Sequence, residues 1–156
     1  MMGVAQMVKR ATKRKQRRPL TRSEQMATIR SRDTQPELIL RRALHAAGLR
    51  FRLHARELPG RPDVVFRPAK LAIFVHGCFW HRHAGCRKAR APATRLDYWE
   101  PKFERNVARD ESNHQRLVEA GWTVMTLWEC EASDATKLAR FVRAVRGKAR
   151  SAALSR

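Results

Sequence analysis

The sequence has no acidic residue near either end. All 14 Asp and Glu residues lie between Glu24 and Asp134, whereas the 156 residues include 34 Lys and Arg, for a formal net charge of +20. Residues 1–22 hold eight basic side chains and residues 137–156 hold seven. Because each phosphate that a basic side chain neutralises releases counterions, this pattern favours a polyanionic partner such as nucleic acid. The alternative is a solvated, solubilising surface.

Long apolar runs are also missing. The longest is Leu71–Val75, far short of the roughly 20 residues that cross a bilayer. The basic N-terminal stretch has no apolar stripe that would lay it on a membrane, and no apolar core of a secretory signal. Three cysteines cannot form a closed disulfide framework. We therefore expect a cytoplasmic protein in a reducing compartment, without a membrane partner.

Internal repeats and Gly/Ser-rich linkers are absent, so we expect one folded domain at residues 23–147 between a disordered basic arm at 1–22 and a basic tail at 148–156. Apolar periodicity predicts helices at 23–30, 36–47, 97–120 and 134–146, and strands at 49–54, 63–66, 71–75 and 122–128. Thr34 and Glu37 fit a capping box, and Gly48 and Gly121 stand where helices stop. The late strand–helix–strand order implies a crossover and hence a mixed α/β sheet flanked by helices.

The few cysteines lie in a metal-binding pattern. Cys78 and Cys86 flank histidines in a short segment between a predicted strand and a predicted helix, and Cys130 follows a later strand. Three thiolates and one imidazole complete the tetrahedral set of a structural zinc. Either His81 or His83 can be the fourth ligand, because the spacing alone does not decide. The alternative is three unrelated thiols.

A second pattern suits a divalent cation. Asp63 begins a strand and lies opposite the end of its hairpin partner, which leads into His76. Mg²⁺ needs only one or two protein carboxylates when a substrate phosphate completes its shell. The strand at 71–75 lacks the acid and lysine that many nucleases carry there. In a nuclease, a histidine would therefore have to transfer the proton, and imidazole titrates near neutral pH.

Aromatic residues gather around the same segment. Phe79 and Trp80 lie between the cysteines and histidines, in poor context for a core, and Tyr98 and Trp99 stand near a helix start. Apolar wedges of this kind unstack base steps in DNA. Packing in the core is the alternative for all of them.

Four strings together carry a resemblance. They are Leu58-Pro59-Gly60-Arg61-Pro62-Asp63, Phe74-Val75-His76-Gly77-Cys78-Phe79-Trp80-His81, Pro92-Ala93-Thr94-Arg95 and Trp128-Glu129-Cys130. From about Ser23 to Cys130 the chain resembles the very short patch repair endonucleases, bacterial enzymes that nick DNA beside T:G mismatches left by deamination of 5-methylcytosine. The resemblance implies the fold of type II restriction endonucleases with a structural zinc.

The resemblance also implies roles for individual residues. Asp63 and the backbone carbonyl of Val75 would bind Mg²⁺, although the family commonly has a hydroxyl residue at the position of Val75. The remaining implied roles are catalysis or its support for His81, His76, Glu37 and Asp110, zinc binding for Cys78, His83, Cys86 and Cys130, and DNA contact for Met26, Ile29, Phe79, Trp80, Trp99, Lys102 and Asn106.

The sequence is thus interpreted as a Mg²⁺-dependent, zinc-containing DNA endonuclease that nicks 5′ to the thymine of a T:G mismatch. We expect a monomer that is associated with the bacterial nucleoid, acts on double-stranded DNA and meets mismatch-repair proteins. The alternatives are a zinc-stabilised DNA-binding module without catalysis, or a nuclease of the same fold with another DNA target.

Overall fold

The structure is a computed structural model and describes residues 32–91 and 95–154. The helix predicted at 23–30, with Met26 and Ile29, lies outside these residues. Among the described helices, none combines the length and the hydropathy that a membrane span requires.

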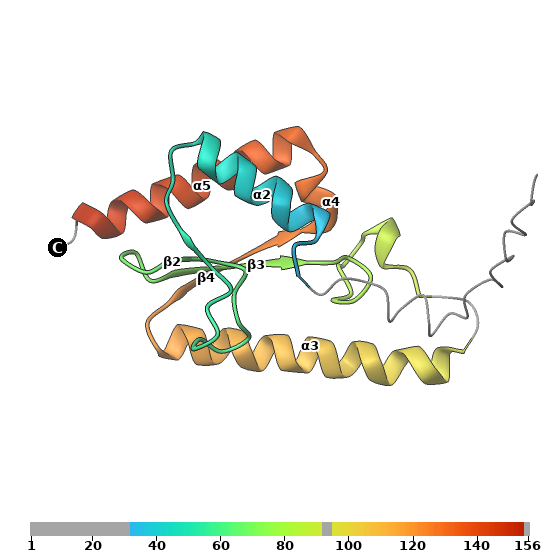
Figure 1. Cartoon of the computed structure of the whole chain (residues 1–156). Coiled ribbons are helices and arrows are strands. Elements are labelled where there is room, and N and C mark those ends of the chain that lie inside the picture. Colours follow the sequence, from blue (N-terminus) through green and yellow to red (C-terminus); the bar gives the residue numbers. More distant parts are fainter. Residues whose placement is uncertain (1–31, 92–94, 155–156) are drawn as a thin grey trace, which may run out of the picture. The chain divides into compact units, whose positions relative to one another are not determined.

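Four strands form one mixed sheet, as predicted (Figure 1). Strands β1 (Arg52–Leu53), β2 (Val64–Phe66) and β3 (Leu71–His76) pair antiparallel in chain order, and β4 (Thr123–Trp128) pairs parallel to β3. The parallel pair is possible because helix α3 (Leu96–Glu119) carries the chain back to the start of the sheet. The crossover inferred from the sequence is therefore confirmed.

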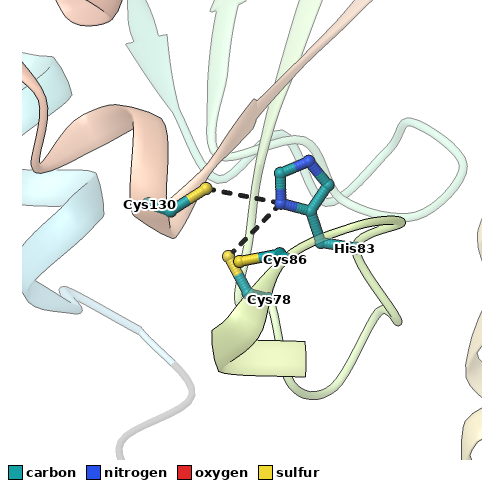
Figure 2. A group of neighbouring side chains, drawn as sticks. All are labelled: Cys78, His83, Cys86 and Cys130. Atoms are coloured by element: carbon teal, nitrogen blue, oxygen red, sulfur yellow. Dashed lines mark hydrogen bonds between the residues drawn. The ribbon is translucent and has the colours of Figure 1, made fainter. Parts of the chain in front are cut away.

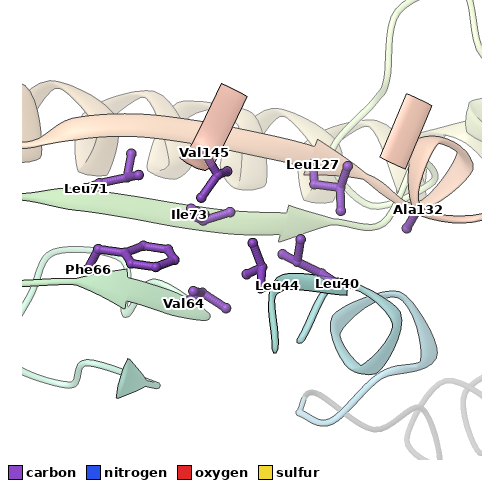
Figure 3. Close-up of a cluster of buried hydrophobic side chains, with 9 residues drawn as sticks. All are labelled: Leu40, Leu44, Val64, Phe66, Leu71, Ile73, Leu127, Ala132 and Val145. Atoms are coloured by element: carbon purple, nitrogen blue, oxygen red, sulfur yellow. The ribbon is translucent and has the colours of Figure 1, made fainter. Parts of the chain in front are cut away.

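Helices cover both faces of the sheet. Helices α2 (Gln35–Ala46) and α5 (Ala135–Leu154) lie on one face, and α3 runs along the other (Figure 1). Figure 3 shows the core beneath α2 and α5, where Leu40 and Leu44 of α2 and Val145 of α5 meet Ile73 and Leu127 of the central strands. Each of these five side chains is fully buried, so the apolar run that begins at Leu71 holds the sheet to both helices.

The helix boundaries follow the capping signals of the sequence. The Glu37 carboxylate accepts hydrogen bonds from the backbone N–H and the hydroxyl of Thr34, which fixes the start of α2. Gly48 and Gly121 adopt φ values of 75° and 77° directly after α2 and α3, a left-handed conformation that glycine enters without strain. Asp134 accepts from the N–H groups of Thr136 and Lys137 and so caps α5.

Two predicted elements have other boundaries in the structure, and one short helix was not predicted. The strand expected at 49–54 is reduced to β1, because His54 turns into the left-handed region and Phe51 packs into the core instead of joining the ladder. The last helix does not end near Arg146 but runs to Leu154, since Ala149 still packs against the core. A short helix, α4 (Glu129–Ala132), precedes it and was not predicted.

Candidate active site

The parallel pairing of β3 and β4 brings two distant segments of the chain to one edge of the sheet. His76 is paired with Trp128 at the carboxyl ends of the two strands. The residues that follow each strand therefore leave the sheet side by side, and the backbone N–H of Cys78 donates to the Glu129 carboxylate at 3.4 Å. This register explains how Cys130 comes back beside Cys78.

The three cysteines meet one histidine at this edge. The Nδ1 atom of His83 lies 3.6 Å from the sulfur of Cys78 and 3.3 Å from that of Cys130, and all four side chains, including Cys86, offer ligand atoms within 4.8 Å of one another (Figure 2). Turn hydrogen bonds from His83 N to Cys78 O and from Cys86 N to His83 O shape the segment. The geometry favours His83 over His81 in this set, a choice that the spacing had left open.

The cluster fits a zinc ion. Zn–S and Zn–N bonds of about 2.3 and 2.0 Å at a tetrahedral angle place sulfur and nitrogen about 3.5 Å apart, close to the two distances found. Burial raises the pKa of the Cys78 thiol to about 12, so its thiolate needs a compensating cation. The His83 ring stacks on Trp128 at 4.1 Å between centroids, which fixes its orientation.

A second cluster joins two histidines and an aspartate. The rings of His76 and His81 stack with centroids 3.9 Å apart and planes 9° from parallel, and His81 Nδ1 donates to the Asp110 carboxylate. Burial, reinforced by the neighbouring His81, lowers the pKa of His76 to about 4, so His76 is neutral near pH 7. Burial alone would raise the pKa of Asp110, but the hydrogen bond and charge of His81 outweigh it and lower that pKa. Asp110 is therefore an anion that orients His81.

Asp63 lies beside the same end of β3. Its Oδ2 atom accepts a 2.7 Å hydrogen bond from the backbone N–H of Val75, and its own N–H donates to Ile73 O at 3.0 Å. Its Oδ1 atom forms no hydrogen bond with any described residue, which leaves it for a cation. Burial raises the pKa of Asp63 to about 6, although the Val75 hydrogen bond opposes the shift. One carboxylate oxygen next to a backbone carbonyl is a set that Mg²⁺ accepts.

Glu37 is buried and fully engaged. Besides its contacts with Thr34, it accepts from the backbone N–H of Asp33 and from Arg41 Nη2 at 2.8 Å. The same Arg41 nitrogen donates to His54 Nε2 at 3.2 Å, and the backbone N–H of His54 donates to the backbone oxygen of Asp63 at 3.3 Å. With both oxygens occupied, Glu37 can position Asp63 through this chain of contacts but has no lone pair directed at a substrate.

Sequence reasoning missed Asp33, Arg41 and His54 in this network. The spacing of four residues between Glu37 and Arg41 was a usable signal for one ion pair on α2. Nothing in the sequence marked His54, because its contact depends on where β1 ends.

The predicted DNA-contact residues divide into buried and accessible groups. Phe79 makes edge-to-face contacts with Trp80, Trp99 and Phe103 at 5.1–5.4 Å between centroids. Trp99 and Phe103 are each only 4% exposed, so they support Phe79 and Trp80 from below. On the accessible side, Lys102 Nζ donates to the Tyr98 hydroxyl at 2.6 Å, and Asn106 Nδ2 donates to the backbone oxygen of Trp80 at 3.3 Å.

Comparison with known proteins decides the family. Residues 16–88 match the family model described as DNA mismatch endonuclease Vsr. The chain is 51% identical over 116 residues to the type II nicking enzyme V.XorIIP of Xanthomonas oryzae pv. oryzae, covering 74% of this chain and 85% of that protein. It is 45% identical over 118 residues to the DNA mismatch endonuclease Vsr of Escherichia coli K12, covering 76% and 75%.

The chain belongs to the Vsr family of DNA mismatch endonucleases. A third relative, the type II nicking enzyme V.NmeAIP of Neisseria meningitidis, is 36% identical over 129 residues, covering 80% of this chain and 91% of that protein. The resemblance drawn from the sequence motifs is thus confirmed, and this Vsr-family protein is an enzyme of the DNA-cleaving hydrolase class. The match to the family model includes Asp63, His76 and His81 and ends before Asp110 and Cys130.

Proposed function

We propose that this Vsr-family endonuclease nicks double-stranded DNA on the 5′ side of the thymine in a T:G mismatch and leaves a 5′-phosphate and a 3′-hydroxyl. The observation that supports it most strongly is the cluster of His76, His81 and Asp110 at the end of β3, next to Val75, whose backbone N–H binds Asp63. A carboxylate on one strand of the hairpin and a proton carrier after the other are the minimum for metal-assisted phosphodiester hydrolysis. The mixed sheet that carries them is compatible with a restriction-endonuclease-like fold.

Two metals are part of the proposal. Asp63 and the backbone carbonyl of Val75 would hold Mg²⁺, and Cys78, His83, Cys86 and Cys130 would hold a structural zinc. When bound, Mg²⁺ supplies Lewis-acid stabilisation of the negative charge on the phosphate oxygens. The zinc site has four protein ligands and no open position, so it serves folding alone.

The side chains of the protein have separate roles in proton transfer and in recognition of the mismatch. The Asp110 carboxylate holds His81 in one orientation, so the free Nε2 atom of His81 can exchange a proton with the reacting water or the leaving oxygen. Because His76 stays neutral and stacks on His81, it fixes that ring without adding a second positive charge. Phe79 and Trp80 enter the base stack beside the mismatch, where a wobble pair unstacks at lower cost than a Watson–Crick pair.

The experiment pairs gel-shift affinity with single-turnover nicking on labelled duplexes that carry T:G, C:G or T:A at one position. We expect Mg²⁺-dependent, strand-specific nicking of T:G alone. Asp63→Ala and His81→Ala should abolish nicking yet keep mismatch binding, since neither side chain supplies most of the affinity. Phe79→Ala and Trp80→Ala should lose mismatch preference as well as rate, because stacking contributes about 1–3 kcal/mol per base.

His114→Ala is the matched control for His81→Ala, because His114 is an exposed histidine on the same helix as Asp110. It should nick like the wild type. Nicking of matched duplexes at the same rate would assign the enzyme another DNA target. Mismatch binding without any Mg²⁺-dependent nicking would leave a zinc-stabilised binding module.

A further inference from the structure

Residues 82–90, which lie between β3 and α3, fold around a hollow of about 390 Å³. They include the short 3₁₀ helix η1 (Arg87–Ala89), and the hollow is lined by residues 82–87, 89 and 90. Three of these are arginines, Arg82, Arg87 and Arg90, and none is acidic. Arg87 and Arg90 are exposed and form no ion pair with any residue that the structure describes.

Arg82 is held in place at one side of this hollow. Its Nη1 atom donates to the backbone oxygen of Ala89 at 2.9 Å, and its guanidinium lies 4.9 Å from the centre of the Phe103 ring. Its backbone adopts φ 54°, a left-handed conformation that costs free energy for any residue with a side chain. A guanidinium has five N–H donors, so the bond to Ala89 leaves others for a ligand. The side chain is pre-organised for an anion rather than free to sample many rotamers.

A zinc centre at the neighbouring cluster would neutralise part of this positive charge. Three thiolates around Zn²⁺ carry a net charge of about −1 when the histidine is neutral. Lys88 is paired with Glu129 at 3.2 Å, so the lysine and the carboxylate cancel. One arginine is therefore enough to balance the metal centre, and two positive charges remain at the hollow.

The position relates this charge to the nicking site. Arg82 directly follows His81 in the chain, and Phe103, on which it rests, also contacts Phe79. We propose that Arg82, Arg87 and Arg90 form a phosphate-binding site for the DNA backbone, which fixes a phosphate that flanks the nicked one. This inference rests on the proposed function, because it assumes that DNA reaches His81 and Phe79. One planar guanidinium group can bind two oxygens of a phosphate at once. Arginine therefore suits a phosphate-binding site better than an isolated lysine.

The test is the salt dependence of duplex binding. Affinity is measured between 50 and 300 mM KCl, without added Mg²⁺, for T:G and matched duplexes. Each phosphate contact contributes about 0.9 to the slope of log K against log salt, so Arg87→Ala and Arg90→Ala should each lower that slope by about 1. The double variant should lower it by about twice as much. The loss should be equal for T:G and matched duplexes, because phosphates carry no sequence information.

Arg50→Ala is the matched control. Arg50 is exposed, and the register of β1 and β2 places it toward the end of the sheet opposite His76. It should leave the slope unchanged, whereas Arg87→Lys with Arg90→Lys should restore most of it. Zinc content equal to that of the wild type shows that the loop is intact, and a slope lowered only in variants that lost zinc would count against the site.

Three outcomes separate the inference from the proposed function. If the wild type nicks T:G duplexes and the alanine variants keep its slope, the phosphate site is wrong and the proposed function stands. If the wild type binds no duplex, both are wrong. If inorganic phosphate at low millimolar concentration saturates the hollow and leaves the duplex slope unaffected, the site binds free phosphate instead of DNA.

Discussion

The Asp63 carboxylate accepts a 2.7 Å hydrogen bond from the backbone N–H of Val75, at the open end of the β2–β3 hairpin, opposite its turn. This bond ties a side chain at the start of one strand to the end of the next, where His76 and His81 follow. It occupies one carboxylate oxygen and leaves the other for a cation. The same burial that fixes the side chain raises its pKa to about 6.

That burial should be measurable as a stability cost without added Mg²⁺. The pKa of Asp63 is about 6 in the folded protein against 3.8 for the free side chain, so the folded state binds the proton more tightly. The cost is absent below about pH 4 and complete above about pH 6. Asp63→Asn should therefore stabilise the protein at pH 8 by up to about 3 kcal/mol, and by much less at pH 4.5. Urea unfolding at both pH values checks this, and equal stabilisation at both would contradict it.

Asp110→Asn should separate the orientation of His81 from the affinity for DNA. The amide keeps the size of the carboxylate but lacks the negative charge that accepts the hydrogen bond of His81 and orients its ring. We expect nicking to slow about 100-fold, the lower end of what general acid–base catalysis contributes, with unchanged affinity for T:G duplexes. Glu111→Gln, an exposed neighbour on α3, is the control and should nick normally. A loss of affinity equal to the loss of rate would instead make Asp110 a DNA-binding residue.

The fourth zinc ligand can be identified by elemental analysis. Cys130→Ser and His83→Ala should each lose the one zinc per chain that we expect, together with much of the folding free energy, because binding of a structural zinc is coupled to folding. His81→Ala should keep the metal, since His81 is bonded to Asp110. Folded, active wild-type protein without zinc would refute the site altogether.

Deletion of residues 1–20 should weaken binding to every duplex alike. It removes seven of the eight basic side chains of residues 1–22, which carry no compensating acid and should therefore contact phosphates rather than bases. The salt dependence of binding should become shallower while the preference for T:G over C:G persists. Loss of that preference in the truncated protein would show that this arm takes part in reading the mismatch.

The strands of the sheet were predictable because the residues that define them are neighbours in the sequence. Val64–Phe66 and Leu71–Val75 are apolar runs bounded by Pro62 and by the Arg67–Lys70 turn, and their burial follows from composition. The return of Cys130 to Cys78 followed from one crossover rule.

Contacts that depend on an unexpected backbone could not be predicted. The network from Arg41 through His54 to Asp63 needs His54 at φ 49°, a conformation that no sequence pattern announces. The start of α4 likewise depends on the Glu131 carboxylate accepting from Trp128 N, a short-range bond that an alternating strand pattern conceals. Propensity describes single residues, whereas these features arise from pairs that meet only after folding.

The parallel pairing of β3 with β4 also sets the order in which the molecule can assemble. The two strands are separated by the zinc-site segment and the 24 residues of α3, so their contact forms only after a long loop has closed. The β2–β3 hairpin, by contrast, closes over a few residues. A zinc ion that first binds Cys78, His83 and Cys86 would be completed by Cys130 only when β4 pairs with β3. Binding of this fourth ligand would then stabilise the paired strand. Metal supply during synthesis would then determine how many chains reach the native state, and not how fast each finished enzyme works.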